Sequence, residues 1–263
     1  MNRKAFFFDI DGTLLSEVNG TVPESTLWAV TELKKRGHLT FVNTGRTISS
    51  VPKEIKEMPF CGFICGCGTY VSYDGDILLS EHIPPERAKE IIRQMNECRA
   101  EFILEGVEEC FYPEYPSRFI RLEEVRRDFR KRDLSTNVYN ERDAFEYDKF
   151  SLYVDETSDM ERIRSCLEKD MEMIDRGDSF YEIVPKKYSK ATGIAFVLDY
   201  FHVKKEDSYV FGDSSNDLPM FQAVEHAIAM GAHAGVLEPY AEYVTKTVEE
   251  DGILHALKTY EIL

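Results

Sequence analysis

Phe6-Phe7-Phe8-Asp9-Ile10-Asp11-Gly12-Thr13 is an apolar strand that breaks into a glycine turn and carries two aspartates one residue apart. Because side chains alternate between the faces of a strand, Asp9 and Asp11 point the same way where the chain leaves the sheet. Carboxylates so placed repel each other, and burying either one is costly. Mg²⁺ removes both problems, since it prefers oxygen ligands and often binds through one or two carboxylates plus a phosphate. The stretch indicates metal-assisted chemistry on a phosphorylated substrate, with an ordinary Asp-x-Asp-Gly turn as the alternative.

Composition limits the classes of function. The 263 residues are 43% hydrophobic, which is enough for one large domain or two unequal ones. The formal net charge of −16 argues against sequence-independent binding to nucleic acid or to anionic membranes, because both rest on clustered Lys and Arg. We therefore expect no nucleic-acid or membrane partner, while a local basic pocket for an anion stays open.

The N-terminus and the cysteines indicate the compartment. The first strand begins within a few residues of Met1, which leaves no room for a signal peptide, and no apolar run approaches the length of a membrane span. We expect a cytoplasmic protein with reduced thiols. Cys61-x-x-x-Cys65-x-Cys67 lacks a second cysteine pair, so buried small residues are a better interpretation than a zinc site.

Two segments of the chain alternate strands with helices. Strands are expected at residues 6–8, 39–42, 62–65, 208–211 and 227–230. Helices are expected from Pro23 to Gly37, with Leu27, Val30 and Leu33 at helical spacing, and at residues 48–58, 191–201 and 218–222. An Asp74-Gly75 turn predicts a hairpin at residues 70–79. This alternation predicts an α/β fold with a doubly wound, Rossmann-like parallel sheet.

The pattern changes at Pro84-Pro85. From there to about Val184 we expect helices at 86–99 and 159–170 and strands near 102–104, 149–154 and 180–184, which suits an inserted α+β module. Residues 126–143 are highly charged and are predicted to be a solvated helix and loop.

Four polar clusters occupy ends of the predicted strands or the start of a helix. In open α/β sheets, ligands bind beyond the carboxyl ends of the strands. Taken singly, each cluster has an ordinary interpretation as a helix cap, a surface lysine or a turn. Together, the four clusters would bring carboxylates, a hydroxyl and a lysine into one crevice. The clusters are Asp9 with Asp11, Thr44 with Arg46, Lys190, and Asp213 with Asn216 and Asp217.

Each cluster has a role that phosphoryl transfer requires. Asp9 is a competent covalent nucleophile toward phosphorus, and Asp11 is placed to protonate the leaving alkoxide and later to deprotonate water. The side chain of Asp9, the backbone carbonyl of Asp11 and the side chain of Asp213 are the candidate Mg²⁺ ligands. Thr44 and Lys190 would bind the phosphoryl oxygens, and Asp217 would hold Lys190 in place.

The four clusters resemble, in their order along the chain, the four motifs of the haloacid dehalogenase superfamily of phosphatases. The matching stretches are Asp9-Ile10-Asp11-Gly12-Thr13, Thr44-Gly45-Arg46, Lys190 and Gly212-Asp213-Ser214-x-Asn216-Asp217. The fourth stretch continues through Leu218-Pro219-Met220, which resembles the Cof-type branch of this superfamily. The resemblance adds Gly45, Arg46 and Asn216 to the expected phosphate-binding set.

The resemblance also implies an organisation into a core and a cap. Residues 1–82 and 185–263 would form the catalytic core, and residues 83–184 a large α+β cap that selects the substrate. Two departures concern the substrate side: Cys67-Gly68 stands where the branch usually has Asn-Gly, and Ala191-Thr192 separate Lys190 from Gly193.

The sequence therefore predicts a Mg²⁺-dependent phosphatase for a small phosphorylated metabolite, such as a sugar phosphate. A sugar phosphomutase and a non-catalytic domain that binds a phosphorylated metabolite are the alternatives. The oligomeric state and the physiological substrate stay open. Candidate substrate contacts from the cap are Arg118, Arg121, Lys149 and Tyr181.

Overall fold

The computed structural model describes residues 3–114, 116–139 and 145–263, and the chain divides into two compact units. The first unit comprises Met1–Gly45, Glu57–Leu79 and Ser189–Leu263; the second comprises Arg46–Lys56 and Ser80–Tyr188. The segment Arg46–Lys56 was expected in the core but groups with the second unit. One reason is that Ser49 Oγ donates a hydrogen bond to the carbonyl oxygen of Gly106 at 2.6 Å.

The first unit is built on a sheet of eight strands in the order β14-β13-β12-β1-β2-β3-β4-β5. The run from β14 to β3 is parallel, and β4 is antiparallel to β3. The strands are β1 (Ala5–Phe8), β2 (Leu39–Asn43), β3 (Gly62–Cys65), β4 (Tyr70–Tyr73), β5 (Asp76–Ser80), β12 (Ser208–Gly212), β13 (His226–Ala229) and β14 (Tyr243–Val244).

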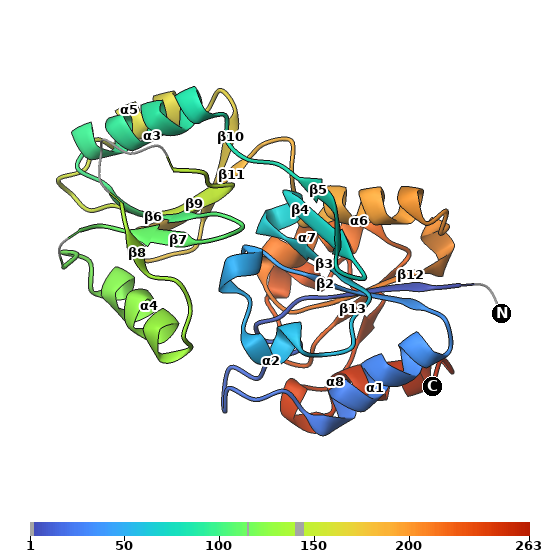
Figure 1. Cartoon of the computed structure of the whole chain (residues 1–263). Coiled ribbons are helices and arrows are strands. Elements are labelled where there is room, and N and C mark those ends of the chain that lie inside the picture. The colour runs from blue at the N-terminus through green and yellow to red at the C-terminus, as the bar shows by residue number, and fades with distance from the viewer. Residues whose placement is uncertain (1–2, 115, 140–144) are drawn as a thin grey trace. The chain divides into compact units, whose positions relative to one another are not determined.

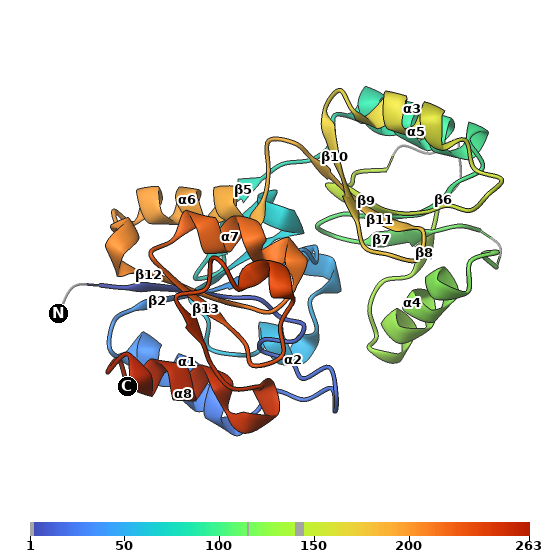
Figure 2. The same ribbon diagram turned by 180° about the vertical axis from the view of Figure 1, so that it is seen from behind.

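Helices cover both faces of this sheet, as Figures 1 and 2 show from opposite sides. One face carries α1 (Glu24–Lys35) and α8 (Gly252–Thr259), and the other carries α6 (Lys190–Tyr200) and α7 (Leu218–Ala223). Strand β1 pairs with β2 on one side and β12 on the other, and helices cover both of its faces, so Phe6, Phe7 and Phe8 are all 0% exposed. The predicted doubly wound parallel sheet is confirmed.

Two helix predictions were wrong in detail. Leu27 is 45% exposed, because the buried face of α1 is formed by Thr26, Ala29, Val30 and Leu33. The expected helix at residues 48–58 is only a 3₁₀ turn, Ile48–Ser50, followed by the single-turn helix α2, Lys53–Lys56. Pro52 causes this break, since the residue before a proline avoids helical backbone angles, and Val51 has φ −68° and ψ 128°.

The second unit contains a six-stranded sheet in the order β10-β11-β9-β6-β7-β8. All its pairs are antiparallel except β7 with β8. The strands are β6 (Glu101–Glu105), β7 (Cys110–Tyr112), β8 (Asn137–Val138), β9 (Lys149–Tyr153), β10 (Met171–Asp175) and β11 (Phe180–Pro185).

Three helices pack on the sheet of the second unit. Helices α3 (Pro85–Glu97) and α5 (Met160–Leu167) share one apolar cluster with Phe102 and Phe150 of the sheet. Helix α4 (Ile120–Lys131) packs through Leu122 against Ile103, which belongs to the opposite face. This arrangement is the predicted α+β module.

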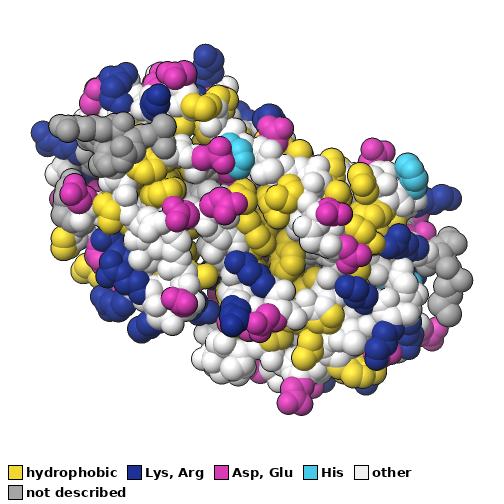
Figure 3. Space-filling view, viewed as in Figure 1, with side chains coloured by type: hydrophobic (Ala, Val, Ile, Leu, Met, Phe, Trp, Pro, Cys, Tyr) yellow, Lys and Arg dark blue, Asp and Glu magenta, His cyan; other side chains and the backbone are white. Residues whose placement is uncertain are grey.

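The charged stretch at residues 126–143 is only partly solvated. Lys and Arg side chains gather over α4 in Figure 3. Arg127, Arg130 and Lys131 of this helix are exposed. Arg126, however, is 5% exposed: its guanidinium lies over the ring of Tyr112, and Nη2 donates to the carbonyl of Pro113 at 3.0 Å. Residues 140–144 lie outside the described residues.

The six cysteines, all among the described residues, form no disulfide, and Cys61, Cys65 and Cys67 are buried, as the sequence predicts. Among the described residues, no helix combines the length and the apolar character that a membrane crossing requires.

Candidate active site

Asp9 lies at the carboxyl end of β1, in the middle of the parallel sheet. Its backbone NH donates to the carbonyl of Phe211 at 3.0 Å, which extends the pairing with β12 by one residue. The side chain is buried, with 5% exposed. Since β1 is flanked by β2 and β12, the loops that follow these three strands meet beside Asp9.

Lys190 reaches Asp9 from the first residue of α6. Its Nζ lies 2.7 Å from Asp9 Oδ1 and 2.5 Å from Asp217 Oδ1, and the side chain is almost completely buried. Ser189 caps the helix, because its Oγ accepts a hydrogen bond from the NH of Thr192. The neighbouring lysines bind elsewhere: Lys186 Nζ donates to the carbonyl of Glu168, and Lys187 Nζ lies 3.2 Å from Glu81.

Asp213 is held beside Asp9 by the turn that follows β1. Thr13 Oγ1 donates to Asp213 Oδ1 at 2.8 Å. Gly12 has φ +78°, and a Cβ at this position would lie 2.4 Å from Asp213 Oδ2. Only glycine therefore permits both the turn and this approach of the carboxylate.

Asp217 organises the loop after β12. Its Oδ2 accepts hydrogen bonds from the NH groups of Asp213 and Ser214 at 2.9 and 3.0 Å, while Oδ1 accepts from Lys190. The carboxylate is completely buried. Asp217 thus joins the loop to Lys190.

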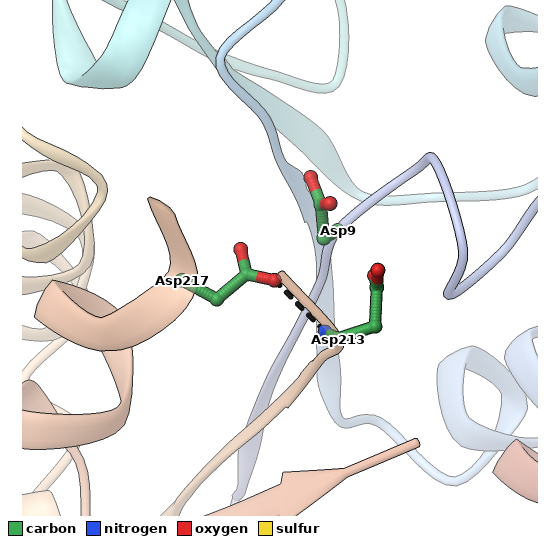
Figure 4. A group of neighbouring side chains, drawn as sticks. All are labelled: Asp9, Asp213 and Asp217. Atoms are coloured by element: carbon green, nitrogen blue, oxygen red, sulfur yellow. Dashed lines mark hydrogen bonds between the residues drawn. The ribbon is translucent and has the colours of Figure 1, made fainter. Parts of the chain in front are cut away.

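The three carboxylates form a group with oxygen atoms within 4.8 Å of one another. Figure 4 shows Asp9 coming from the end of β1, and Asp213 and Asp217 from the segment that follows β12. Three carboxylates face the one ammonium group of Lys190, which leaves two formal negative charges in excess. Hard oxygen ligands with this excess fit a divalent cation such as Mg²⁺.

The pKa values of Asp9 and Asp213 reflect their burial and the excess of negative charge. Burial raises the pKa of Asp9 to about 7; Lys190 opposes this rise, and repulsion from Asp217 and Asp11 adds to it. Burial and repulsion from Asp9 and Asp217 raise the pKa of Asp213 to about 8. Burial lowers the pKa of Lys190, but the attraction of Asp217 and Asp9 outweighs burial and raises it above its usual value. Lys190 is therefore a fixed positive charge.

Asp11 and Thr44, which were also predicted for the site, follow strands β1 and β2 in the chain. Asp11 is half-buried, and its backbone bridges to Leu15. Thr44 is 2% exposed; its NH donates to the carbonyl of Ile64 at 2.9 Å, and its carbonyl accepts from the NH of Cys67 at 3.2 Å. The loop that begins with Thr44 and Gly45 is therefore anchored on the end of β3.

Arg46 and Asn216 make local contacts. Arg46 belongs to the second unit, where its Nη1 donates to the carbonyl of Ser50 at 3.2 Å. Asn216 is half-buried and its Oδ1 accepts from Ser214 Oγ at 2.6 Å. Their expected role in phosphate binding stays a prediction.

Two residues of the site escaped the sequence analysis. Thr13 was quoted in the first motif without a role. Its hydroxyl, directly after the turn at Gly12, could have indicated a hydrogen bond to a neighbouring loop. Asn43, at the end of β2, donates through Nδ2 to the carbonyl of Lys190 at 3.1 Å. No sequence pattern marks Asn43, because its partner lies far away in the chain.

The four candidate contacts from the second unit differ in their surroundings. Arg118 pairs with Asp155, and Arg121 lies over the ring of Phe180. Tyr181 packs against the apolar cluster under α3 and α5. The buried member of the set is Lys149, which is 4% exposed.

Comparisons with known proteins agree with this geometry. The profile of the haloacid dehalogenase-like hydrolases matches residues 6–257. YkrA of Bacillus subtilis, provisionally named a phosphatase, is 28% identical over the whole of both chains. The 5-amino-6-(5-phospho-D-ribitylamino)uracil phosphatase YitU of the same organism is 27% identical, and the match covers 96% of this chain and 95% of that one.

Solved structures show the same fold. The subclass IIB sugar phosphatase BT4131 superposes with a TM-score of 0.81 at 25% identity, over 99% of this chain and 100% of the other. BT1666 of Bacteroides thetaiotaomicron, from a study of phosphatases, gives 0.83 at 26% identity, over 99% and 96%. The predicted family and the predicted class of enzyme, a phosphatase, are confirmed. The chain belongs to the haloacid dehalogenase-like hydrolase family.

Proposed function

We propose that this phosphatase is Mg²⁺-dependent and hydrolyses a small phosphomonoester through an aspartyl-phosphate on Asp9. The observation that carries the proposal is the group of Asp9, Asp213 and Asp217 around Lys190 at the carboxyl edge of the sheet, in which Asp213 is half-buried and the others are buried. An acid that is both buried and held beside a fixed positive charge is suited to act as a nucleophile toward a phosphoryl group.

The metal would be held by the side chains of Asp9 and Asp213 and by the backbone carbonyl of Asp11. Asp217 is a poorer ligand, because its oxygens already accept bonds from Lys190 and from two backbone NH groups. When bound, Mg²⁺ offsets the excess negative charge and polarises a phosphoryl oxygen.

The chain's own residues would carry the bond changes. A carboxylate oxygen of Asp9 attacks phosphorus while the bond from phosphorus to the leaving oxygen breaks, and Asp11 gives that oxygen its proton. Asp11 then takes a proton from water, which attacks the phosphorus of the aspartyl-phosphate. Inorganic phosphate leaves and the Asp9 carboxylate is restored.

The remaining residues of the motifs would hold the phosphoryl group. Thr44, Gly45, Arg46 and Asn216 would bind its oxygens together with Lys190. Asp217 would keep Lys190 in place, which its 2.5 Å contact supports. Phosphate monoesters react extremely slowly without a catalyst, with enzymatic accelerations up to ~10²¹, so several stabilising groups are needed together.

We assign substrate selection to residues 83–184, acting as a cap on a core of residues 1–82 and 185–263. The substrate would be a sugar phosphate or a similar metabolite. Two relatives support this class: BT4131 is described as a sugar phosphatase, and YitU by its name acts on a phosphorylated ribityl compound.

Release of phosphate from p-nitrophenyl phosphate tests the proposal. We expect phosphate release in MgCl₂ and none in EDTA. If the metal-loaded protein releases no phosphate, catalysis is refuted, and the alternative of a phosphometabolite-binding domain is left. A panel of sugar phosphates, nucleotides and pyridoxal phosphate, ranked by kcat/KM, identifies the substrate class. Mass spectrometry of the sugar phosphates after incubation distinguishes hydrolysis from isomerisation by a mutase.

A further inference from the structure

Asn43 is a completely buried polar residue at the end of β2 that the proposed mechanism does not use. Its Nδ2 donates to the backbone carbonyl of Lys190 at 3.1 Å and lies 3.7 Å from Met220 Sδ. These contacts join β2 to the first residue of α6 and to α7, all within the first unit. Asn43 therefore holds the main chain of the residue whose side chain reaches Asp9.

The amide is only half satisfied. Among the described residues, Asn43 Oδ1 is buried without a hydrogen-bond partner. An unpaired buried carbonyl oxygen is unfavourable for folding, and an apolar side chain of the same size would avoid this penalty. A polar residue at this position is therefore explained better by what it does for Lys190 than by stability.

Other contacts fix the start of α6 by shape alone. A Cβ at Gly193 would lie 2.3 Å from Ile64 Cγ2, and a Cβ at Gly68 would lie 2.4 Å from the carbonyl oxygen of Ser189. These close approaches bring the helix against β3 and the segment that follows it. They act on the neighbours of Lys190, whereas Asn43 binds Lys190 itself.

We propose that Asn43 is a positioning residue, which orients Lys190 toward the phosphoryl group through the first carbonyl of α6. The inference rests on the proposed function, in which Lys190 binds phosphoryl oxygens. Loss of the amide donor would let the first turn of α6 shift, and a displacement of about 1 Å at a catalytic group can lower the rate about 100-fold. The side chain of Asn43 acts only through Lys190.

Asn43→Leu tests this role, because leucine has the same number of side-chain heavy atoms, branched at the same position, but donates no hydrogen bond. We expect kcat to fall about 10- to 100-fold, inhibition by inorganic phosphate to weaken, and the melting temperature to stay equal or rise. A residue with a merely structural role would show a lower melting temperature instead. Asn43→Ala, which fits without overlap, replaces the leucine variant if that one does not fold; the same fall in kcat is expected.

Thr40→Val is the matched control. Thr40 is also completely buried on β2, but its hydroxyl donates to Cys61 Sγ at 3.6 Å and not to α6. We expect wild-type kcat and phosphate inhibition from this variant. Equal losses of activity in Thr40→Val and Asn43→Leu would overturn the inference.

Hydrogen–deuterium exchange separates the inference from the proposed function. The first turn of α6 should exchange faster in Asn43→Leu than in the wild type or in Thr40→Val. Unchanged exchange together with unchanged kcat would overturn the role of Asn43. If the wild type releases no phosphate, the proposed function fails, and the exchange comparison still decides whether Asn43 holds the start of α6.

Discussion

Two lysines are buried between pairs of carboxylates, one lysine in each unit of the molecule. In the first unit, Lys190 Nζ lies 2.7 and 2.5 Å from its two partners; in the second, Lys149 Nζ lies 2.5 and 3.3 Å from its partners. The partners are Asp9 and Asp217 for Lys190, and Glu182 and Glu105 for Lys149. Both lysines are less than a twentieth exposed, with 2% and 4%.

The two clusters differ in their charge balance. A third carboxylate, Asp213, joins the cluster of Lys190, so acids outnumber bases by two. In the second unit, Arg176 Nε lies 4.0 Å from Glu182, so two acids face two bases. An excess of negative charge at a largely buried site is offset by a bound cation or by protons, whereas a balanced cluster needs neither. This difference supports the proposal that Mg²⁺ binds at the cluster of the first unit.

The largest expected effect is the loss of the nucleophile. Asp9→Asn should lower kcat at least about 10³-fold, because removal of a covalent nucleophile typically costs several orders of magnitude. Asp199→Asn, the same change on the exposed surface of α6, is the control and should keep full activity. Steady-state phosphate release measures both, with circular dichroism to verify the fold. Full turnover by Asp9→Asn would remove Asp9 from the mechanism.

Removing either lysine should distinguish the clusters by their response to Mg²⁺. Breaking a buried ion pair on one side costs about 3–5 kcal/mol, so Lys149→Met and Lys190→Met should both unfold at lower urea concentration in EDTA. Mg²⁺ should restore part of the lost stability in Lys190→Met, since it offsets the larger excess of negative charge in that cluster. It should restore none of the lost stability in Lys149→Met. Equal rescue of both variants would contradict the difference in charge balance.

The pH dependence of the Mg²⁺ effect follows from the raised pKa values. Because Asp9 and Asp213 have a pKa of about 7 and about 8 in the folded protein, against 3.8 ordinarily, the folded state binds more protons than the unfolded state between these values. Their stabilising contribution is complete below about pH 4 and is lost as the pH rises through about 7 and 8.

Mg²⁺ should therefore raise the melting temperature more at about pH 8 than at about pH 5, since protons compete for the same carboxylates. Mg²⁺ at 100 times its Kd would raise the free energy of unfolding by about 2.7 kcal/mol. Melting curves with MgCl₂ and with EDTA at both values test this. An equal gain at both pH values would speak against metal binding by Asp9 and Asp213.

The smallest effect concerns the backbone beside Thr44. Cys67 has φ 55° and ψ 36°, a left-handed conformation that asparagine adopts more readily than cysteine. Cys67→Asn should raise the free energy of unfolding by about 0.5 kcal/mol, measured by urea denaturation. Cys67→Ala, which keeps the backbone penalty, is the control; a gain of the same size there would exclude backbone strain as the cause.

Sequence reasoning succeeded where the signal is local. The apolar run before Asp9 and the glycine-containing loop at Asp213 each mark a strand end by themselves, and parallel strands bring such ends together. Asp217 was expected to hold Lys190, and the two lie 2.5 Å apart; the contact of Lys190 with Asp9 was not predicted, because Lys190 starts a helix and does not end a strand.

Sequence reasoning failed where long-range packing or a competing local signal decides. Nothing near Asn43 indicates that its amide meets Lys190, and the pairing of Lys149 with Glu182 depends on the antiparallel register of β9 and β11. Pro52 breaks the helix that was predicted at residues 48–58. The exposure of Leu27 shows that a spacing of apolar residues does not by itself fix which stripe of α1 is buried.

Trapping the phosphoenzyme tests the central claim most directly. The protein is mixed with Mg²⁺ and a good substrate, quenched with acid within one turnover, and digested for mass spectrometry. We expect the mass of one phosphoryl group on the peptide that contains Asp9, and none in Asp9→Asn. Turnover without a labelled peptide, or with the label on another residue, would contradict the account.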